Sequence, residues 1–328
     1  MNRRLLGIAI AAASSLASAA AGQQAPPPTA PIADPRDVVA FEQDESDRMT
    51  VPVSIGGRGP YRFIVDTGSE RTVISQELAS RLDLHAGSEA TLHSISGSGE
   101  VSTVIIPRLR VSKRTVRGIH APALSAADIG AVGMLGIDSL KTQRVLFDFD
   151  RRTMAITPSI QYERDWGPNT IVVKARTRYG RLVLSDARID GEKVLVILDT
   201  GSQVTIGNGA LRRKLVARNK LQPTRPIELL SVTGGLAPAD YTKVRHVRLG
   251  GIHIRDLPIA FADIHPFRQL GLHGRPALLL GMDALKLFDR VSVDFAHQRV
   301  QFLAPDIGLI EEETRLAQLM SAPRVAAR

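Results

Sequence analysis

Hydrophobic and polar positions alternate in short runs along most of the chain, a pattern typical of β-strands joined by tight turns. The alternating run Thr50–Ile55 is followed by Gly56–Pro60, which predicts a turn, and then by the apolar run Tyr61–Val65. The same order returns as Ala187–Ile189, a turn, and Val194–Leu198. We therefore expect a mostly β fold containing two equivalent hairpins.

Each of these hairpins ends in the same tetrapeptide, Asp-Thr-Gly-Ser, at residues 66–69 and 199–202. By composition, a given tetrapeptide occurs in a chain of this length with a probability of roughly one in several hundred, so two copies in matching contexts are not a coincidence. A carboxylate at the end of a buried strand is costly unless it is paired, hydrogen-bonded or neutral. Asp66 and Asp199 are therefore expected to be each other's partners.

A second pair of motifs follows downstream in each half. Leu135–Lys141 has the sequence Leu-Gly-Ile-Asp-Ser-Leu-Lys and returns as Leu280–Lys286, Leu-Gly-Met-Asp-Ala-Leu-Lys. Each is followed by an apolar strand pattern, at Val145–Phe149 and at Val291–Phe295. The order of all these motifs indicates an internal duplication of a whole domain.

The second half is longer between its two motifs. Asp66 and Gly136 are 70 residues apart, whereas Asp199 and Gly281 are 82 apart, so the second half carries 12 more residues. We place much of the excess at Asp263–Pro276, expected as a loop beside the second apolar-Gly motif. Such an insertion is suited to tuning specificity.

The N-terminus has the pattern of a secretory signal peptide over residues 1–21. Arg3 and Arg4 precede an apolar run at Leu5–Ala13, and small residues at Ala17–Ala21 offer cleavage sites. The apolar run is too short to predict a membrane span, so we expect export to the periplasm or medium of a bacterium, without stable membrane insertion after signal removal. The expected divisions are a signal peptide (1–21), a Pro-rich linker (22–45), two lobes (46–160 and 161–305) and a C-terminal tail (306–328).

Charge and composition narrow the chemistry further. The net charge is +9, or +7 without the two signal arginines, but the basic residues are scattered and lack a nucleic-acid motif. There is no cysteine, which excludes a disulfide framework. The eight histidines lack metal-ligand spacing, so we expect neither a metal nor a cofactor.

On these motifs the sequence resembles the retropepsin-like aspartic peptidases, in the exported tandem-domain form of bacteria, over residues 51–303. The resemblance implies two β-barrel lobes related by pseudo-twofold symmetry, with the active site between them. Asp66 and Asp199 would be the catalytic pair, and the segments Met134–Gly136 and Leu279–Gly281 would cross behind the two turns.

The resemblance and the chemistry give each motif residue a role. The threonine hydroxyls would lock the two turns together, the glycines would leave room beside the carboxylates, and the serines could donate hydrogen bonds that favour the ionised form. These supporting residues are Thr67, Gly68, Ser69, Thr200, Gly201 and Ser202.

Two hairpin tips rich in Ser, Thr and Gly are candidate flaps over the substrate. The alternative interpretation is two ordinary surface hairpins. Pepsin-like enzymes carry a flap tyrosine and usually disulfides, and this chain has neither, so it resembles two fused retropepsin-like domains more closely. The candidate flap residues are Ser96, Gly97, Ser98, Gly99, Thr233, Gly234 and Gly235.

The preferred function is an aspartic endopeptidase acting on peptides or proteins, as a monomer whose lobes pair within one chain. The connection at 155–181 is long enough for that pairing, although lobes exchanged between two chains stay an alternative. A further alternative is a non-catalytic or latent peptide-binding protein of the cell envelope. Asp138 and Asp283 are expected to be helix N-caps, and Asp148 and Asp294 to be structural or solvated.

Overall fold

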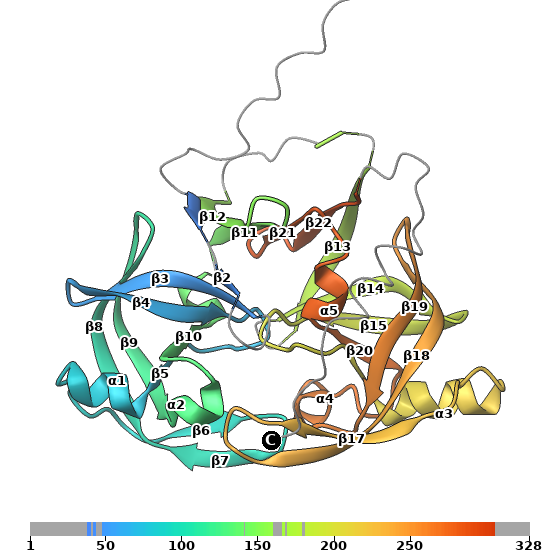
Figure 1. Cartoon of the computed structure of the whole chain (residues 1–328), viewed down its shortest axis with the longest axis horizontal. Helices are drawn as coiled ribbons and strands as arrows, with labels where there is room; N and C mark the ends of the chain where they lie inside the picture. Colours follow the sequence, from blue (N-terminus) through green and yellow to red (C-terminus); the bar gives the residue numbers. More distant parts are fainter. Residues whose placement is uncertain are drawn as a thin grey trace, which may run out of the picture. The chain divides into compact units, whose positions relative to one another are not determined.

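The computed structural model describes residues 38–40, 42–43, 48–140, 142–159, 166–167, 169–178 and 181–305, all of them in one compact unit (Figure 1). The expected signal peptide, most of the expected linker and the C-terminal tail lie outside these ranges. Within them, no helix combines the length and apolar character that crossing a membrane requires.

Six strands of the first lobe close into a barrel, because β3 pairs with β4 on one side and with β8 on the other. Buried and half-exposed residues alternate along β3 from Val51 to Ile55, as expected for a barrel strand with a packed interior. A short strand, β2 (Glu42–Gln43), extends the barrel beside β3. In sheet order, the barrel strands are β3 (Met49–Ile55), β4 (Arg58–Val65), β10 (Gly133–Leu135), β5 (Val73–Ser75), β9 (Arg114–Leu124) and β8 (Thr103–Val111).

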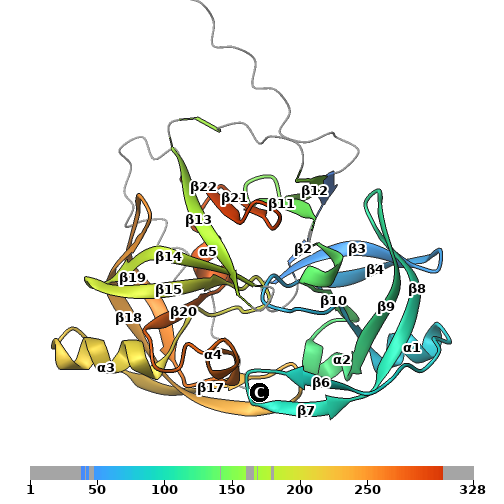
Figure 2. The same cartoon turned by 180° about the vertical axis from the view of Figure 1, so that it is seen from behind.

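The second lobe repeats this barrel strand for strand, closed by the pairing of β14 with β18. Figures 1 and 2 show the two barrels as separate groups of strands. The expectation of a mostly β fold with two barrel lobes is confirmed. In the matching order, the strands are β14 (Arg181–Ile189), β15 (Glu192–Leu198), β20 (Ala277–Leu280), β16 (Ile206–Gly207), β19 (Ile252–Phe261) and β18 (Leu236–Leu249).

A further set of six strands joins the two lobes. Its centre is the antiparallel pair β11 and β21, in which Leu146 lies opposite Ser292. Its outer strands differ from the sequence expectation: β1 lies in the range expected as linker, β13 lies within the connection expected at 155–181, and β12 overlaps the start of that connection. In order, the strands are β1 (Val38–Ala40), β12 (Thr153–Pro158), β11 (Gln143–Asp148), β21 (Arg290–Asp294), β22 (Arg299–Leu303) and β13 (Thr170–Arg178).

Two buried ion pairs cross between β11 and β21. Asp148 accepts a hydrogen bond of 2.8 Å from Arg290 Nε, and Arg144 Nε lies 3.5 Å from Asp294. The register places both pairs directly opposite each other, two residues on either side of Leu146. Asp148 and Asp294 are therefore structural and buried, not solvated, and they bind one lobe to the other.

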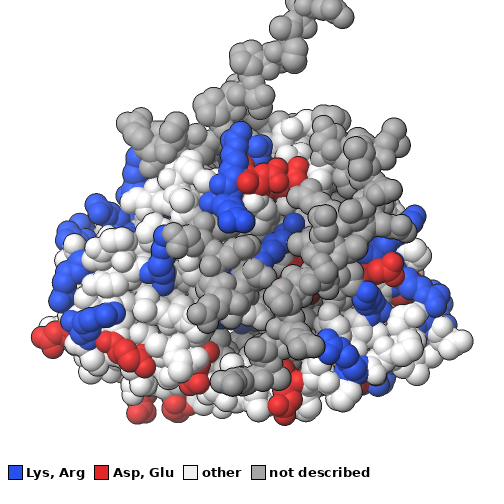
Figure 3. Space-filling view, in the orientation of Figure 1, with Lys and Arg blue, Asp and Glu red and all other residues white. Residues whose placement is uncertain are grey.

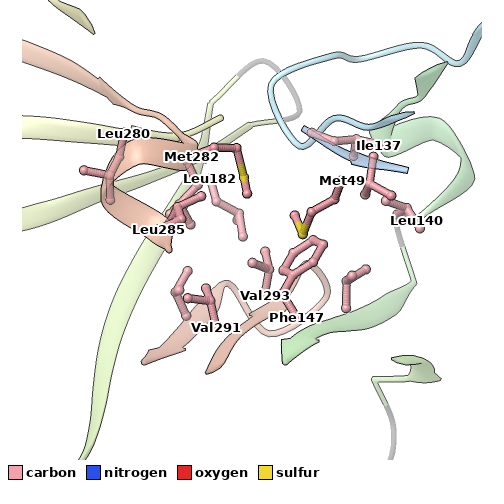
Figure 4. Close-up of a cluster of buried hydrophobic side chains, with 14 of the residues drawn as sticks. Met49, Ile137, Leu140, Phe147, Leu182, Leu280, Met282, Leu285, Val291 and Val293 are labelled. Carbon is pink, nitrogen blue, oxygen red and sulfur yellow. The ribbon is translucent and has the colours of Figure 1, made fainter. Parts of the chain in front are cut away.

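The hydrophobic core continues from one lobe to the other across this central sheet. Figure 4 shows Met49 and Leu140 of the first lobe and Leu182 and Leu285 of the second above the sheet residue Phe147. All five are at most 4 % exposed and belong to one cluster. The burial of this shared apolar surface ties the relative position of the lobes to the stability of the fold.

Short helices and two hairpins complete the lobes. Ser75 caps α1 by accepting from Leu78 N, and Asn208 caps α3 by accepting from Leu211 N. The inserted segment at 263–276 was expected as a loop but contains α4, which starts with a proline at its first turn. These elements are α1 (Gln76–Arg81), α2 (Ala126–Ile129), α3 (Gly209–Ala217), α4 (His265–Gln269), α5 (Met282–Leu285), a 3-10 helix (Ile137–Ser139), β6 (Ala90–His93), β7 (Ser98–Val101) and β17 (Arg225–Leu230).

Charged side chains are spread over the surface that the described residues form. On the face shown in Figure 3, Lys and Arg side chains lie in separate groups, with Asp and Glu between some of them and along one edge. The excess positive charge is therefore distributed over this face instead of forming one continuous basic patch.

Candidate active site

The two Asp-Thr-Gly-Ser turns are held by strands that cross behind them. β10 runs parallel to β4, and the carbonyl oxygen of Leu135 accepts a hydrogen bond of 3.0 Å from Asp66 N. In the second lobe, β20 runs parallel to β15, and Leu280 O accepts an equal bond from Asp199 N. Each aspartate thus leaves a buried strand at a point fixed by the backbone of a neighbouring strand.

Thr67 and Thr200 connect the two turns by reciprocal hydrogen bonds. Thr67 N donates to Thr200 Oγ1 at 3.0 Å, and Thr200 N donates to Thr67 Oγ1 at 3.2 Å. Their hydroxyls donate in turn to the opposite strand, Thr67 Oγ1 to Leu198 O and Thr200 Oγ1 to Val65 O. Both threonines are at most 3 % exposed, so these bonds form away from water, where losing a partner is costly.

Backbone donors surround one oxygen of each aspartate. Asp66 Oδ1 accepts from Gly68 N at 2.7 Å and from Ser69 N at 3.0 Å, and Asp199 Oδ1 accepts equivalent bonds from Gly201 and Ser202. The serine hydroxyls differ from the expectation. Each has one hydrogen and donates it to a loop carbonyl, Arg71 O or Val204 O, so it supports the turn and not the carboxylate.

Gly68 and Gly201 face the aspartate of the opposite lobe. A Cβ atom on Gly68 would lie 2.6 Å from Asp199 Oδ1, and a Cβ atom on Gly201 would overlap the carboxyl group of Asp66. Glycine is therefore needed at both positions so that the two carboxyls can approach each other.

The pair Asp66 and Asp199, called the dyad below, lies in a buried setting that opposes full ionisation. Asp66 is 8 % exposed, and burial followed by the negative charge of Asp199 raises its pKa to about 7. Burial also raises the pKa of Asp199, whose side chain is hydrogen-bonded to Asp66. Both shifts oppose full ionisation of the dyad and favour a form that carries one proton, which belongs to the pair and not to either residue.

Asp138 and Asp283 brace the loops that follow the dyad turns. Asp138 accepts hydrogen bonds from Thr72 N and Oγ1, and Asp283 accepts the same pair from Thr205. The expectation that they are N-caps was wrong, because a glycine stands at the N-cap of each short helix and the aspartate lies inside it. Their hydrogen bonds reach across to another segment of the lobe, a contact that local sequence does not reveal.

The two candidate flaps are hairpin tips, as the sequence predicts, although the first is shifted. In the first flap, Ser94 N donates to Gly97 O, so the turn spans 94–97 and Ser98 and Gly99 already belong to β7. In the second flap, the turn between β17 and β18 is closed by Ser231 N donating to Gly235 O. Gly234 has a φ of 77° there, a conformation that favours glycine.

The tips of the two flaps contact each other. Thr233 Oγ1 lies 3.1 Å from Ser94 Oγ, 3.2 Å from Ser96 Oγ and 3.0 Å from Ser231 Oγ. Gly235 packs closely on Ser96, since a Cβ atom there would lie 2.6 Å from Ser96 Oγ. Thr233 is thus the centre of a hydroxyl cluster that joins the flap of one lobe to the flap of the other.

A histidine pair adds a second connection beside this cluster. His93 of β6 and His265 of α4 stack with ring centroids 5.0 Å apart, and His93 Nδ1 lies 2.8 Å from His265 Nε2. The backbone contributes as well, because His265 N donates to Ile95 O at 3.3 Å. The inserted segment of the second lobe therefore touches the flap of the first.

Replacing Thr233 with valine should loosen both flaps. Removing the shared hydroxyl costs about 1 kcal/mol, which corresponds to roughly fivefold faster hydrogen exchange of the backbone amides at 94–97 and 231–235. Thr91→Val is the matched control, because the Thr91 hydroxyl bonds only within the first flap, to Glu100. If exchange in the second flap is the same in both variants and in the wild type, the hydroxyl cluster does not hold the flaps together.

Three residues at this site escaped the sequence interpretation. His93 and His265 were considered only as metal ligands, and Arg181, a buried cation near the dyad, was not singled out. A signal for Arg181 was present, since it starts an apolar strand that pairs with the strand leading to Asp199. In the part of the chain that the structure describes, no three His, Cys, Asp or Glu residues gather as a metal site would require.

Comparison with known proteins agrees with this geometry. A search of curated proteins finds no match for the chain. A family model described as aspartyl protease matches residues 51–139 and 185–284, which is one segment in each lobe and more than half of the chain. Each matched segment contains one aspartate of the dyad and the strand that crosses behind it. The chain therefore belongs to the aspartyl protease family, in a retropepsin-like form with two lobes.

Proposed function

We propose that this protein is an aspartic endopeptidase whose dyad activates water to hydrolyse peptide bonds. The observation that carries the proposal is the close approach of two carboxyls from the two lobes, that of Asp66 buried and that of Asp199 partly buried. Family membership supports a protease-type function, and the dyad supplies a mechanism for it.

In this mechanism, the ionised carboxyl of the dyad removes a proton from a water molecule that attacks the peptide carbonyl carbon. The protonated carboxyl donates its proton to the carbonyl oxygen, which gives a neutral tetrahedral intermediate. Collapse of the intermediate breaks the C–N bond as a proton passes to the leaving nitrogen. The dyad then again holds one proton, so the cycle is balanced and needs no other reactant.

The flaps are proposed to cover an extended peptide and to exclude water during this reaction. Because the two tips are joined through Thr233, a substrate must part them before it reaches the dyad. This closed arrangement also favours the alternative of a latent protein, in which the flaps prevent cleavage until they open.

We further propose that the protein acts as an exported monomer. Export rests on the signal pattern at residues 1–21. The monomer is supported by the central sheet, in which three strands of the first half and three of the second meet at the pairing of β11 with β21.

The test is cleavage of a mixed peptide library from acidic to neutral pH by the wild type and by Asp199→Asn. We expect the wild type to cut with activity that falls as pH rises above about 7, since the dyad then loses its one proton. Asp199→Asn should lose roughly a thousandfold or more of the rate. Asp186→Asn, an exposed aspartate on β14, is the matched control and should cut normally. Tight peptide binding without any cleavage by the wild type would instead establish a binding or latent role.

A further inference from the structure

A buried arginine lies beside the dyad at the start of β14. Arg181 is 7 % exposed, and its Nε atom has no hydrogen-bond partner among the residues that the structure describes. In the pairing of β14 with β15, Val183 lies opposite Ile197, so continuing the register by two residues places Arg181 opposite Asp199. An arginine held out of water with an unsatisfied donor is costly unless a nearby negative charge compensates for it.

The Arg181 side chain lies on the face of β14 that is directed toward the second flap and the dyad. Side chains alternate along a strand, so Arg181 shares a face with Val183. Val183 packs in the cluster that includes Leu229 of the second flap and Phe267 of α4, whereas the next residue, Leu184, belongs to the main core. Arg181 therefore lies on the flap side of β14, where its partner strand leads into Asp199.

The first lobe has an arginine at the equivalent place, but it is used differently. Thr50 lies opposite Ile64, and two residues further in this register Arg48 falls opposite Asp66. The guanidinium of Arg48 packs against Gly130, at the end of α2. The two arginines thus lie in different settings, and it is the arginine of the second lobe whose charge lowers the pKa of both aspartates.

The ionisation of the dyad depends on nearby charges as well as on burial. The negative charge of Asp199 raises the pKa of Asp66. The positive charge of Arg181 lowers the pKa of both aspartates and so opposes the effect of burial.

We propose that Arg181 is the counter-cation of the dyad, a positioning residue that stabilises the singly charged form of the Asp66–Asp199 pair. A buried pair without a cation would be neutral over most of the acidic range and would lack the carboxylate that takes a proton from water. Arg181 provides a buried positive charge on the strand beside Asp199, and this charge favours the carboxylate. The expected effect of Arg181 on cleavage rests on the proposed function, whereas its expected effect on the titration of the dyad does not.

The titration of the dyad gives the direct test. Arg181→Met removes the charge and keeps an apolar stem of similar length, and we expect both ionisations of the dyad to move up by about one pH unit. Aspartate carboxyl carbons labelled with ¹³C report these ionisations by NMR, with Asp66→Asn and Asp199→Asn for assignment. Arg181→Lys keeps the positive charge, so the dyad should ionise almost as it does in the wild type. Arg48→Met, the symmetry-related control, should leave the titration of the dyad unchanged.

The profile of kcat/KM against pH should move in the same direction. For Arg181→Met, both limbs are expected to shift upward by about one unit, so that activity on the acidic side falls about tenfold. A wild type that cleaves nothing would contradict the proposed function and leave the NMR test of Arg181 intact. An unchanged NMR titration in a folded Arg181→Met protein would overturn the inference about Arg181 and leave the function standing.

A thermodynamic cycle covers the case in which Arg181→Met does not fold by itself. In the Asp66→Asn/Asp199→Asn background no carboxylate remains, so Arg181 is an uncompensated buried cation and Arg181→Met should raise the Tm. In the wild-type background the same change should lower the Tm. Equal changes in Tm in both backgrounds would show that Arg181 does not interact with the dyad.

The kinetic experiment has its own contrary outcome. If Arg181→Met changes the preference for acidic residues in the substrate while the pH profile of kcat/KM stays where it is, Arg181 acts in specificity instead.

Discussion

Replacing Asp66 with asparagine is expected to make the protein more stable near neutral pH while it removes cleavage. The carboxyl of Asp66 has a pKa raised to about 7 in the folded protein, against 3.8 as its ordinary value. The folded state therefore binds this proton more tightly than the unfolded state does between these two pH values. The stability that Asp66 contributes is present below pH 4 and is lost as pH rises towards 7.

The size of this loss follows from the shift. Each pKa unit is worth about 1.4 kcal/mol, so a shift of this size costs up to about 4 kcal/mol at neutral pH. Asparagine keeps the shape and carries no charge at any pH, so it avoids the cost. Activity should fall roughly a thousandfold or more, because the dyad can no longer supply both an acid and a base.

Urea unfolding of the wild type and Asp66→Asn at pH 5 and pH 8 measures the effect. The difference in unfolding free energy should grow with pH in favour of the variant. Asp283, whose pKa burial raises to about 6, contributes a similar pH dependence to both proteins and cancels in the comparison. A difference that is the same at both pH values would contradict the burial of an ionising carboxyl at position 66.

Replacing Arg290 with methionine should destabilise the protein by about 3 kcal/mol, because it leaves the carboxylate of Asp148 buried without its cation. The two side chains are 17 % and 5 % exposed and 2.8 Å apart. Asp148 keeps one donor, Arg151 N, which lessens the penalty but supplies no charge. Urea unfolding at pH 7 measures the change.

An exposed ion pair gives the matched control for this prediction. Arg248 lies 3.0 Å from Asp186, with the two side chains 38 % and 63 % exposed. Arg248→Met should cost less than about 1 kcal/mol, since exposed pairs contribute little. The double variant Arg290→Met/Asp148→Leu should regain most of the lost stability. Equal costs for Arg290→Met and Arg248→Met would mean that burial does not set the strength of the Asp148 pair.

Much of the architecture could be predicted from repetition in the sequence. Two copies of the Asp-Thr-Gly-Ser turn and two copies of the apolar-Gly motif indicate two equivalent lobes. Hydrophobic and polar positions alternate in the segments beside these motifs, and these segments form the strands of the barrels. The pairing of strands far apart in the sequence could not be predicted in this way. β1 pairs with β12 and β13 with β22, and neither segment has neighbours in the sequence that identify its partner.

In the candidate site, too, local motifs could be predicted from the sequence and contacts between distant residues could not. Asp66 and Asp199 are apparent from local motifs, because the chemistry needs a carboxylate after a buried strand. The direction of a hydroxyl is not apparent, since Ser69 and Ser202 had a carboxylate and a loop carbonyl within reach and donate to the carbonyl. The contact of His93 with His265 joins residues 172 positions apart, and only the folded lobes bring them together.

The ion pairs between β11 and β21 have a consequence for the origin of the fold. Both strands carry arginine and aspartate in the same order, Arg144 and Asp148 in one, Arg290 and Asp294 in the other. In an antiparallel pair this order is self-complementary, so two copies of β11 would form the same two bridges as β11 with β21. Either half, expressed alone, should therefore tend to form a homodimer through this strand. In the present chain the same kind of interface joins two halves that are covalently linked.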